Sequence, residues 1–281
     1  MKNFWVNVGK AAAYFGAYFC GQVVVSFIVS FVLSMIISTK MVMESGTLDM
    51  DAYTENVTNA LSGAMSYILI FSGILTILAF FVVAKIRKKK FLQTAQLNKF
   101  KGATVAPIII GGITFNFTIS FLMNLVPFPE SWIESYQSSS SEVLGGAGIV
   151  LWISAVIMAP LVEELTFRCF MYTRLKQAMP TWIAVIITSI VFGLVHGTII
   201  WAIYTFVFSV VLIFIFERTK SLWASILFHM SFNFVGAFMS TWPELAEKLY
   251  GTWFMIGYIA LFLGAAVLFI LVSRNKVKEE A

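Results

Sequence analysis

Long apolar runs alternate with short polar segments along almost the whole chain. A helix needs roughly 20 apolar residues to cross the hydrocarbon core of a bilayer. Runs of about this length predict membrane-spanning helices at about 11–38, 64–84, 103–126, 148–171, 182–197, 200–216, 222–240 and 253–273. We therefore predict an all-α, polytopic integral membrane protein with about eight transmembrane helices. A Trp- and Tyr-containing segment after Pro129 predicts one additional short helix at the membrane interface.

The composition supports a membrane protein. Of the 281 residues, 59% are hydrophobic and 12% are charged, whereas a soluble domain is about 45–50% apolar and about 25% charged. The first apolar run exceeds a signal-peptide core of about 7–15 residues, so we expect it to be a retained span. Cys20 and Cys169 both fall in predicted spans, so the sequence predicts neither a disulfide framework nor a cysteine-based metal site.

The charges along the chain predict its orientation. Eight spans place both termini on the same side of the membrane. Most basic residues fall on that side, including seven between Lys85 and Lys101, whereas the opposite side holds Lys40, Lys248 and most of the acidic residues. Positive charge marks the cytoplasmic side, so we expect a multi-pass cell-membrane protein with cytoplasmic termini. The net charge of +5 then reflects topology, and we expect the lipid bilayer, not nucleic acid, as the partner.

Several ionisable residues interrupt the apolar runs. Each costs on the order of 2.5–3.5 kcal/mol at the centre of a membrane helix. The fourth predicted span contains Glu163, Glu164 and Arg168, and later spans contain the chain's two histidines, His196 and His229. Groups placed there at such a cost must neutralise one another or take part in chemistry.

Helical spacing divides these residues between faces. Glu164 and Arg168 are four residues apart with the glutamate first, which is the favourable order for an ion pair. Glu163 is turned about 100° away from Glu164 and is free to face a cavity. His229 and Asn233 are also four residues apart. At about 1.5 Å per residue, these groups and the other histidine lie at comparable depths, so we expect them to meet inside the membrane.

This set of residues is suited to hydrolysis. A carboxylate shielded from bulk water can act as a general base, and an imidazole with an amide can stabilise a developing oxyanion. In that mechanism Glu163 and His196 activate water, while His229 and Asn233 stabilise the tetrahedral intermediate. Two histidines and one glutamate are also the ligand set of many catalytic zinc sites. Glu163, His196 and His229 are therefore also candidates to hold Zn²⁺, although no HExxH helix is present.

Three motifs carry a family resemblance. EELTFR (163–168), FGLVH (192–196) and HMSFN (229–233) resemble the EExxxR, FxxxH and HxxxN motifs of the CAAX-protease and bacteriocin-processing family, also called CPBP or Abi. Type II CAAX prenyl endopeptidases belong to this family. SLWASILFH (221–229) resembles the family's sequence before the last motif. The resemblance covers roughly residues 148–240. It divides the chain into an N-terminal transmembrane region (1–147), a CPBP/Abi catalytic core (148–240) and a last span with a basic tail (241–281).

The resemblance implies an intramembrane endopeptidase with a helical core and a cavity open to the cytosol and the membrane. It assigns the catalytic site to six residues: Glu163, Glu164, Arg168, His196, His229 and Asn233. The first glutamate and the FGLVH histidine would activate water, the second glutamate and the arginine would orient the site, and the last two residues would hold the oxyanion. The family is described both as metalloproteases and as glutamate-dependent enzymes without metal. Cys169 departs from the pattern, because family members commonly have glycine there.

We therefore expect an endopeptidase that hydrolyses a peptide bond of a membrane-associated or lipid-modified peptide or protein. One alternative is a non-catalytic membrane scaffold that regulates a signalling, cell-wall or bacteriocin-immunity system. Another is a proton-coupled transporter that uses glutamate and histidine as a relay. A transporter would usually show repeated halves or broken helices, and neither is evident in the sequence.

Overall fold

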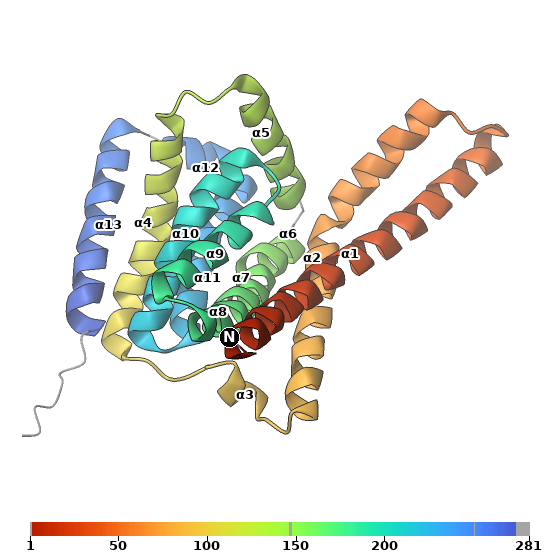
Figure 1. Ribbon diagram of the computed structural model, residues 1–281. Coiled ribbons are helices and arrows are strands. Elements are labelled where there is room, and N and C mark those ends of the chain that lie inside the picture. The colour runs from red at the N-terminus through yellow and green to blue at the C-terminus, as the bar shows by residue number, and fades with distance from the viewer. Residues whose placement is uncertain (1, 146–147, 250, 274–281) are drawn as a thin grey trace, which may run out of the picture.

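The computed structural model describes residues 2–145, 148–249 and 251–273. Every regular element within these ranges is a helix (Figure 1). Seven of these helices are long and apolar enough to cross a membrane, and the shorter apolar helix α9 (Thr181–Leu194) corresponds to the span expected at 182–197. The prediction of an all-α, polytopic membrane protein with about eight spanning helices is confirmed.

The first two spans form a long helical hairpin that leans away from the rest of the molecule (Figure 1). It consists of α1 (Lys2–Ser45) and α2 (Met50–Ile86). The predicted spans end at 38 and begin again at 64, which leaves the polar segment 39–61 outside both helices. This was wrong for most of that segment, because both helices continue into it. The Asp49 side chain accepts hydrogen bonds from two backbone N–H groups of the first turn of α2, which stabilises the helix start.

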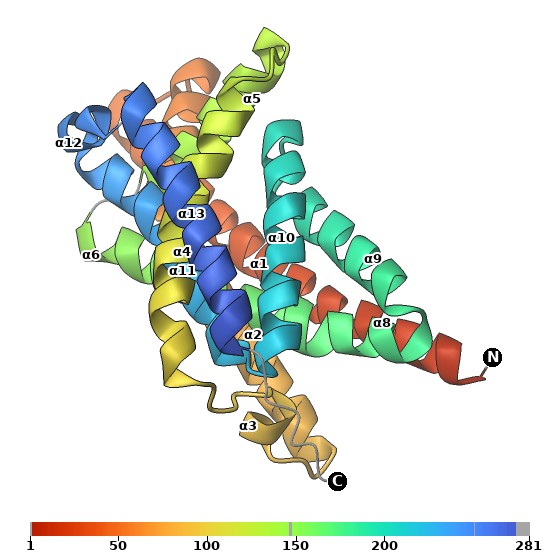
Figure 2. The same ribbon diagram turned by 90° about the vertical axis from the view of Figure 1, so that its left-hand side faces the viewer.

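Three helices pack together at the other side of the molecule (Figure 2). Here α4 (Val105–Asn124) contacts both α11 (Leu222–Thr241) and α13 (Thr252–Ser273). A Cβ atom at Gly112 would lie 2.6 Å from the Phe228 carbonyl oxygen. Glycine at this position therefore allows α4 to approach the backbone of α11, as small residues do between membrane helices.

The helices α9 and α10 (Ile199–Thr219) form a tightly packed antiparallel pair. A Cβ atom at Gly193 would lie 2.7 Å from the Ala202 carbonyl oxygen, so the two backbones are in close contact. Gly197 in the short connection has a φ of +86°, which favours glycine. Thr198 then caps α10 by accepting a hydrogen bond from the Trp201 N–H.

The fourth span differs from the regular helix expected from sequence. Its consecutive parts are α6 (Gly148–Leu151), the π-helix η2 (Trp152–Met158), α7 (Ala159–Glu163), the π-helix η3 (Glu164–Tyr172) and α8 (Thr173–Ala178). Pro160 lies between the two π-helical segments and has no backbone N–H, so the α-helical hydrogen-bond ladder is interrupted there. Such π-helical turns are frequent at functional sites.

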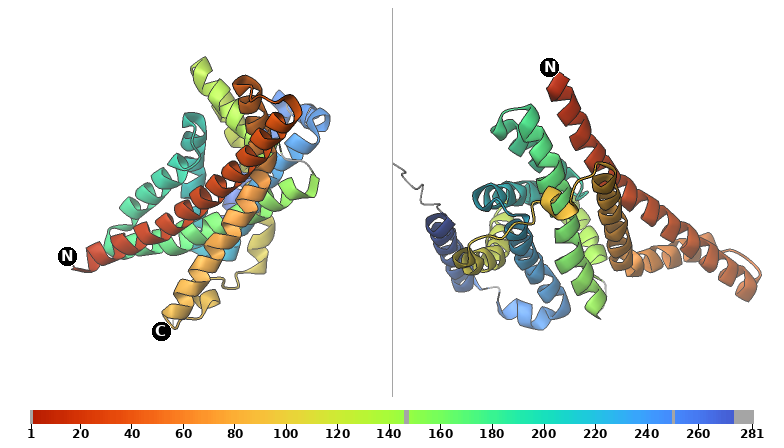
Figure 3. Two further views of the ribbon diagram at one scale, coloured as in Figure 1. Left: turned by 90° about the vertical axis from the view of Figure 1, so that its right-hand side faces the viewer. Right: turned by 90° about the horizontal axis from the view of Figure 1, so that it is seen from below.

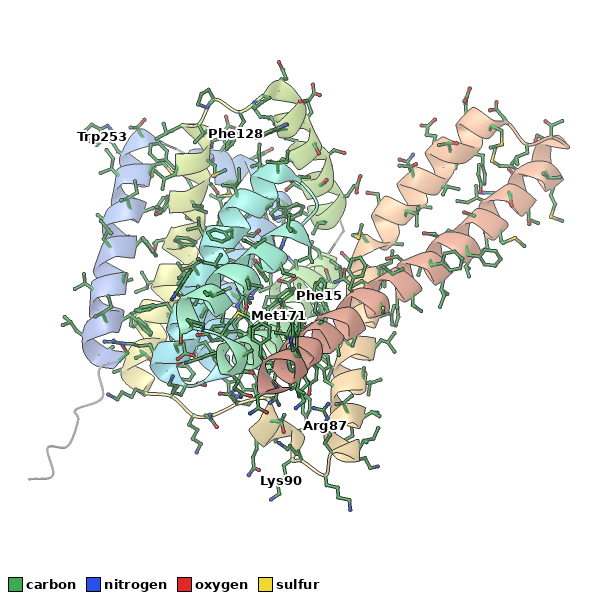
Figure 4. All side chains as sticks on the ribbon, in the orientation of Figure 1. Phe15, Arg87, Lys90, Phe128, Met171 and Trp253 are labelled. Atoms are coloured by element: carbon green, nitrogen blue, oxygen red, sulfur yellow. The ribbon has the colours of Figure 1, made fainter. Side chains whose placement is uncertain are left out.

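Short helices cover the two ends of the bundle. They are α3 (Phe91–Thr94), the 3₁₀-helix η1 (Gly102–Thr104), α5 (Glu130–Leu144) and α12 (Pro243–Lys248). The additional helix expected after Pro129 is confirmed as α5. Arg87 and Lys90 project from the lower end in Figure 4, whereas Phe128 and Trp253 lie at the upper end.

The lower end also joins segments that are distant in sequence, as the view from below shows (Figure 3). Asn98 donates a hydrogen bond of 2.9 Å to the Lys220 carbonyl oxygen. Arg218 donates one of 3.0 Å to the Ser273 hydroxyl at the end of α13. The start of α1 lies at the same end (Figure 1). The described ends of the chain, the lysine-rich segment and the α10–α11 connection therefore share one end of the bundle.

Candidate functional site

A buried polar network joins the fourth span to α11. The Oε1 atom of Glu164 lies 3.0 Å from Nη1 of Arg168 and 2.9 Å from Nδ1 of His229. The side chains of Glu164 and Arg168 are fully buried, and that of His229 is 4% exposed. The expected ion pair within EELTFR is therefore present. Because a carboxylate accepts hydrogen bonds, we place the proton of the histidine on Nδ1, which leaves Nε2 as an acceptor.

Arg168 has a second partner in the FGLVH motif. Its guanidinium carbon lies 4.2 Å from the centre of the Phe192 ring. Phe192 is fully buried and packs against Phe167 at 5.0 Å between ring centres. A guanidinium above an aromatic face is attracted by the ring, and more strongly where water is excluded. The phenylalanine of FGLVH therefore helps to hold the arginine of EELTFR, a contact that we did not predict although both residues belong to the motifs.

Glu163 faces away from the ion pair formed by its neighbour. Its Oε2 atom lies 3.8 Å from Nε2 of His229, and the Glu163 side chain is 15% exposed. That oxygen is buried and has no hydrogen-bond partner among the described residues. A buried, unpartnered carboxylate oxygen is costly. The position is therefore suited to a water molecule, a substrate group or a cation.

His196 lies just beyond the end of α9, next to the same phenylalanine. Its Nδ1 atom is 2.6 Å from the Phe192 carbonyl oxygen, so Nδ1 donates and Nε2 is left as an acceptor. Its ring centre lies 4.9 Å from that of Phe192. Within the described ranges no hydrogen bond or ion pair joins His196 to Glu163. The structure thus links this histidine to the network through Phe192.

Asn233 follows His229 on the next turn of α11. Its Nδ2 atom donates a hydrogen bond of 2.8 Å to the Ala155 carbonyl oxygen in η2. One of the two amide protons is therefore used to bind the π-helical segment, and the other remains for a ligand. The sequence did not indicate this backbone partner, because the π-helical geometry of η2 leaves no local signal.

Two further polar residues have structural partners. Asn116 in α4 donates a hydrogen bond of 3.1 Å to the Phe232 carbonyl oxygen and so joins α4 to α11. Cys169, the departure from the family pattern, donates from Sγ to the Thr94 carbonyl oxygen at 3.1 Å. Its larger side chain thereby attaches α3 to the back of η3.

The side chains are also relevant to metal binding. Metal-ligating histidines usually donate their second N–H to a carboxylate or a carbonyl, and both His229 and His196 make such a contact. However, no three His, Cys, Asp or Glu side chains in the described part of the chain converge closely enough to hold an ion. Zinc binding by Glu163, His196 and His229 therefore stays a prediction.

Comparisons with known proteins find a family that the motif-bearing part of the chain is similar to. Residues 145–235 match the family model described as "Type II CAAX prenyl endopeptidase Rce1-like". This result confirms the resemblance that the three motifs predicted, over the part of the chain that carries them. At the level of the family, the matched region is similar to membrane proteases.

Individual relatives are more distant. UPF0177 protein YbdI of Lactococcus lactis is 26% identical over 127 residues, which are 45% of this chain and 68% of that protein. YdiL of Bacillus subtilis, whose name describes a candidate membrane peptidase, is 25% identical over 92 residues, 33% of this chain and 37% of that protein. UPF0177 protein YxdF of Lactococcus lactis is 25% identical over 133 residues, 46% of this chain and 73% of that protein. No solved structure matches the chain.

Proposed function

We propose that this protein is an intramembrane endopeptidase that hydrolyses a peptide bond of a membrane-associated or lipid-modified peptide or protein. The observation that carries the proposal is the arrangement of two adjacent glutamates. Glu164 is paired with Arg168 and His229, whereas Glu163 presents an unpartnered oxygen beside the same histidine. One carboxylate is thus held by the protein and the other is free to react.

In the proposed reaction Glu163 is the general base. It takes a proton from a water molecule whose oxygen forms a bond with the scissile carbonyl carbon. The carbon–nitrogen bond then breaks, and the proton passes to the leaving amine, so that one water is added across the peptide bond. His196 would assist the activation of water, because its Nε2 atom is left as an acceptor.

The remaining residues would orient the base and stabilise charge. Glu164 and Arg168 hold His229 in place through the buried network. Asn233 retains one amide proton that can be donated to the oxyanion. A zinc ion on Glu163, His196 and His229 would instead supply the activated water through the metal. The metal content of active protein distinguishes these two mechanisms.

We also propose that both termini are cytoplasmic. The lower end of the bundle brings together the start of α1, the lysine-rich segment and the end of α13. Basic residues are favoured on the cytoplasmic side. The substrate would then be a peptide or protein that is held at the membrane by its own apolar or lipid-modified part.

The test is cleavage by detergent-purified protein of a quenched library of membrane-associated and lipid-modified peptides. We expect Glu163→Gln, which is nearly isosteric, to lower the rate by at least about 100-fold through loss of the general base. Glu142→Gln is the matched control, because Glu142 lies exposed on α5. Cleavage that survives Glu163→Gln would contradict the mechanism. The alternative function, a non-catalytic membrane scaffold, would be supported by two results together. The purified wild-type protein would cleave none of the peptides, and the Glu163→Gln variant would still restore the phenotype of a deletion strain.

A further inference from the structure

The N-terminal hairpin contributes to the surroundings of Glu163, although its sequence carries none of the family motifs. A small cavity adjoins the glutamate. It is lined by residues of α1, α2, η2 and α7: Tyr18, Gln22, Leu69, Ser72, Gly73, Met158, Ala159, Val162 and Glu163. Two polar side chains of α1, Tyr18 and Gln22, therefore face the same space as the reactive carboxylate.

The cavity is large enough to admit water. The centre of a water molecule can move within about 10 Å³ of it, so it exceeds the minimum for a hydrated site, which is an occupied volume of roughly 10–15 Å³, about one water-sized sphere. A buried water also requires two to four polar partners. The polar side chains of Glu163, Tyr18 and Gln22 line the cavity.

The rest of the wall keeps the cavity small. A Cβ atom at Gly73 would lie 2.7 Å from Cγ of Met158, so α2 packs directly on η2. Tyr18 is 5% exposed, and its ring lies edge-on to Phe167 at 5.5 Å between ring centres. Its hydroxyl interacts with Gln22 one turn further along α1. The rest of the cavity wall is therefore mainly apolar, and only the polar side chains can form hydrogen bonds with a molecule in the cavity.

We infer that this cavity holds a water hydrogen-bonded to Glu163, and that Tyr18 and Gln22 are the residues that position it. The inference rests on the proposed hydrolytic function and adds that α1 supplies part of the water-binding site. Hydrolysis consumes one water in each turnover, and water is scarce in hydrocarbon. A site for water beside the base therefore keeps the second reactant available.

Tyr18→Phe removes the hydroxyl and retains the ring that packs on Phe167. We expect a roughly tenfold fall in kcat with unchanged KM, because one hydrogen bond to the water is lost and substrate binding is not affected. Gln22→Leu should act in the same direction. Tyr14→Phe is the matched control, because Tyr14 lies one turn earlier on α1, is also buried, and bonds Arg87 instead of the cavity. All three variants should keep the wild-type melting temperature within a few degrees.

A high-resolution structure of the wild type provides a readout that does not depend on substrate. We expect density for one water within hydrogen-bond distance of Glu163 and Tyr18, and its loss in the double variant Tyr18→Phe/Gln22→Leu. A dry wild-type cavity, or a kcat for Tyr18→Phe equal to that of Tyr14→Phe, would overturn the inference. The proposed function would survive that outcome if Glu163→Gln is inactive in the same assay. Activity of Glu163→Gln would remove the proposed function, while the water density would still decide whether the site exists.

Discussion

The Nδ1 atom of His229 lies 2.9 Å from the Oε1 atom of Glu164, and this contact joins α11 to η3. It fixes the orientation of the imidazole, because the opposite nitrogen then points toward Glu163 at 3.8 Å. The Nη1 atom of Arg168 lies 3.0 Å from the same Glu164 oxygen, and its positive charge balances that of the carboxylate. The pair therefore positions the candidate site without presenting a charge of its own to the cavity.

Arg168→Met tests how strongly this buried pair supports the fold. The substitution leaves the fully buried Glu164 carboxylate without its countercharge, which costs about 3–5 kcal/mol when one partner of a buried ion pair is removed. We expect a marked fall in the melting temperature in detergent, measured by tryptophan fluorescence.

The control for this variant is Lys176→Met. Lys176 pairs with Glu217 at 2.7 Å, but its side chain is 35% exposed and Glu217 keeps a second partner in Lys220. Exposed pairs contribute about 1 kcal/mol or less. If the two substitutions lowered the melting temperature equally, the buried ion pair would contribute no more to stability than the exposed one.

The two proposed mechanisms of water activation predict different metal contents for the active protein. If zinc is bound by Glu163, His196 and His229, wild-type protein should contain about one zinc per chain, and both Glu163→Ala and His229→Ala should lose metal and cleavage together. If Glu163 activates water directly, active wild-type protein should be free of stoichiometric metal, and a chelator should leave its cleavage rate unchanged. Elemental analysis and cleavage on one sample decide between them, with Ser231→Ala, elsewhere on α11, as the control.

Gly193→Ala should disturb the site through the backbone. The added Cβ would lie 2.7 Å from the Ala202 carbonyl oxygen, so α9 and α10 must separate. Overpacking of this kind costs about 1–3 kcal/mol, and His196 lies only three residues further on. We expect lower stability and slower cleavage than in wild type.

Gly264→Ala on α13 is the matched control for this substitution, because no other atom lies within 4 Å of the place that its Cβ would take. Alanine favours a helix over glycine by about 1 kcal/mol, so stability should be equal or slightly higher. A stable, active Gly193→Ala protein would mean that the two helices can separate without effect on the site.

Orientation can be tested with single cysteines in a Cys20→Ser background, since Cys169 is buried. A membrane-impermeant thiol reagent added to intact cells should label the Phe128→Cys variant, whose cysteine lies at the upper end of the bundle (Figure 4). The Lys90→Cys variant, at the lower end, should be labelled only after the cells are permeabilised. The opposite pattern would reverse the proposed topology.

The sequence predicted the features that depend on local patterns of residues. Apolar length identified the spans, and the spacing of Glu164 and Arg168 predicted their ion pair. The prediction failed at 39–61, because polar residues can continue a helix once its end is capped, as Asp49 does for α2. Polarity alone does not separate a loop from the solvent-exposed part of a helix.

The details of the site were less accessible. The π-helical segments η2 and η3 have no local signal except Pro160, and the hydrogen bond from Asn233 to Ala155 depends on them. The contribution of Tyr18 depends on how α1 crosses the fourth span. A tyrosine in an apolar helix gives no indication of which distant carboxylate it will face, since that is decided by tertiary packing.

The length of the N-terminal hairpin has a consequence for the surrounding lipid. The apolar run of α1 covers about 28 residues, or about 42 Å of helix. This length exceeds a hydrocarbon core about 30 Å thick, so the helix must tilt or the bilayer beside it must thicken. Figure 1 shows α1 steeply inclined to α4 and α13. Because the hairpin and the bundle are inclined to each other, we expect the acyl chains beside the hairpin to be less well aligned than those in the rest of the bilayer.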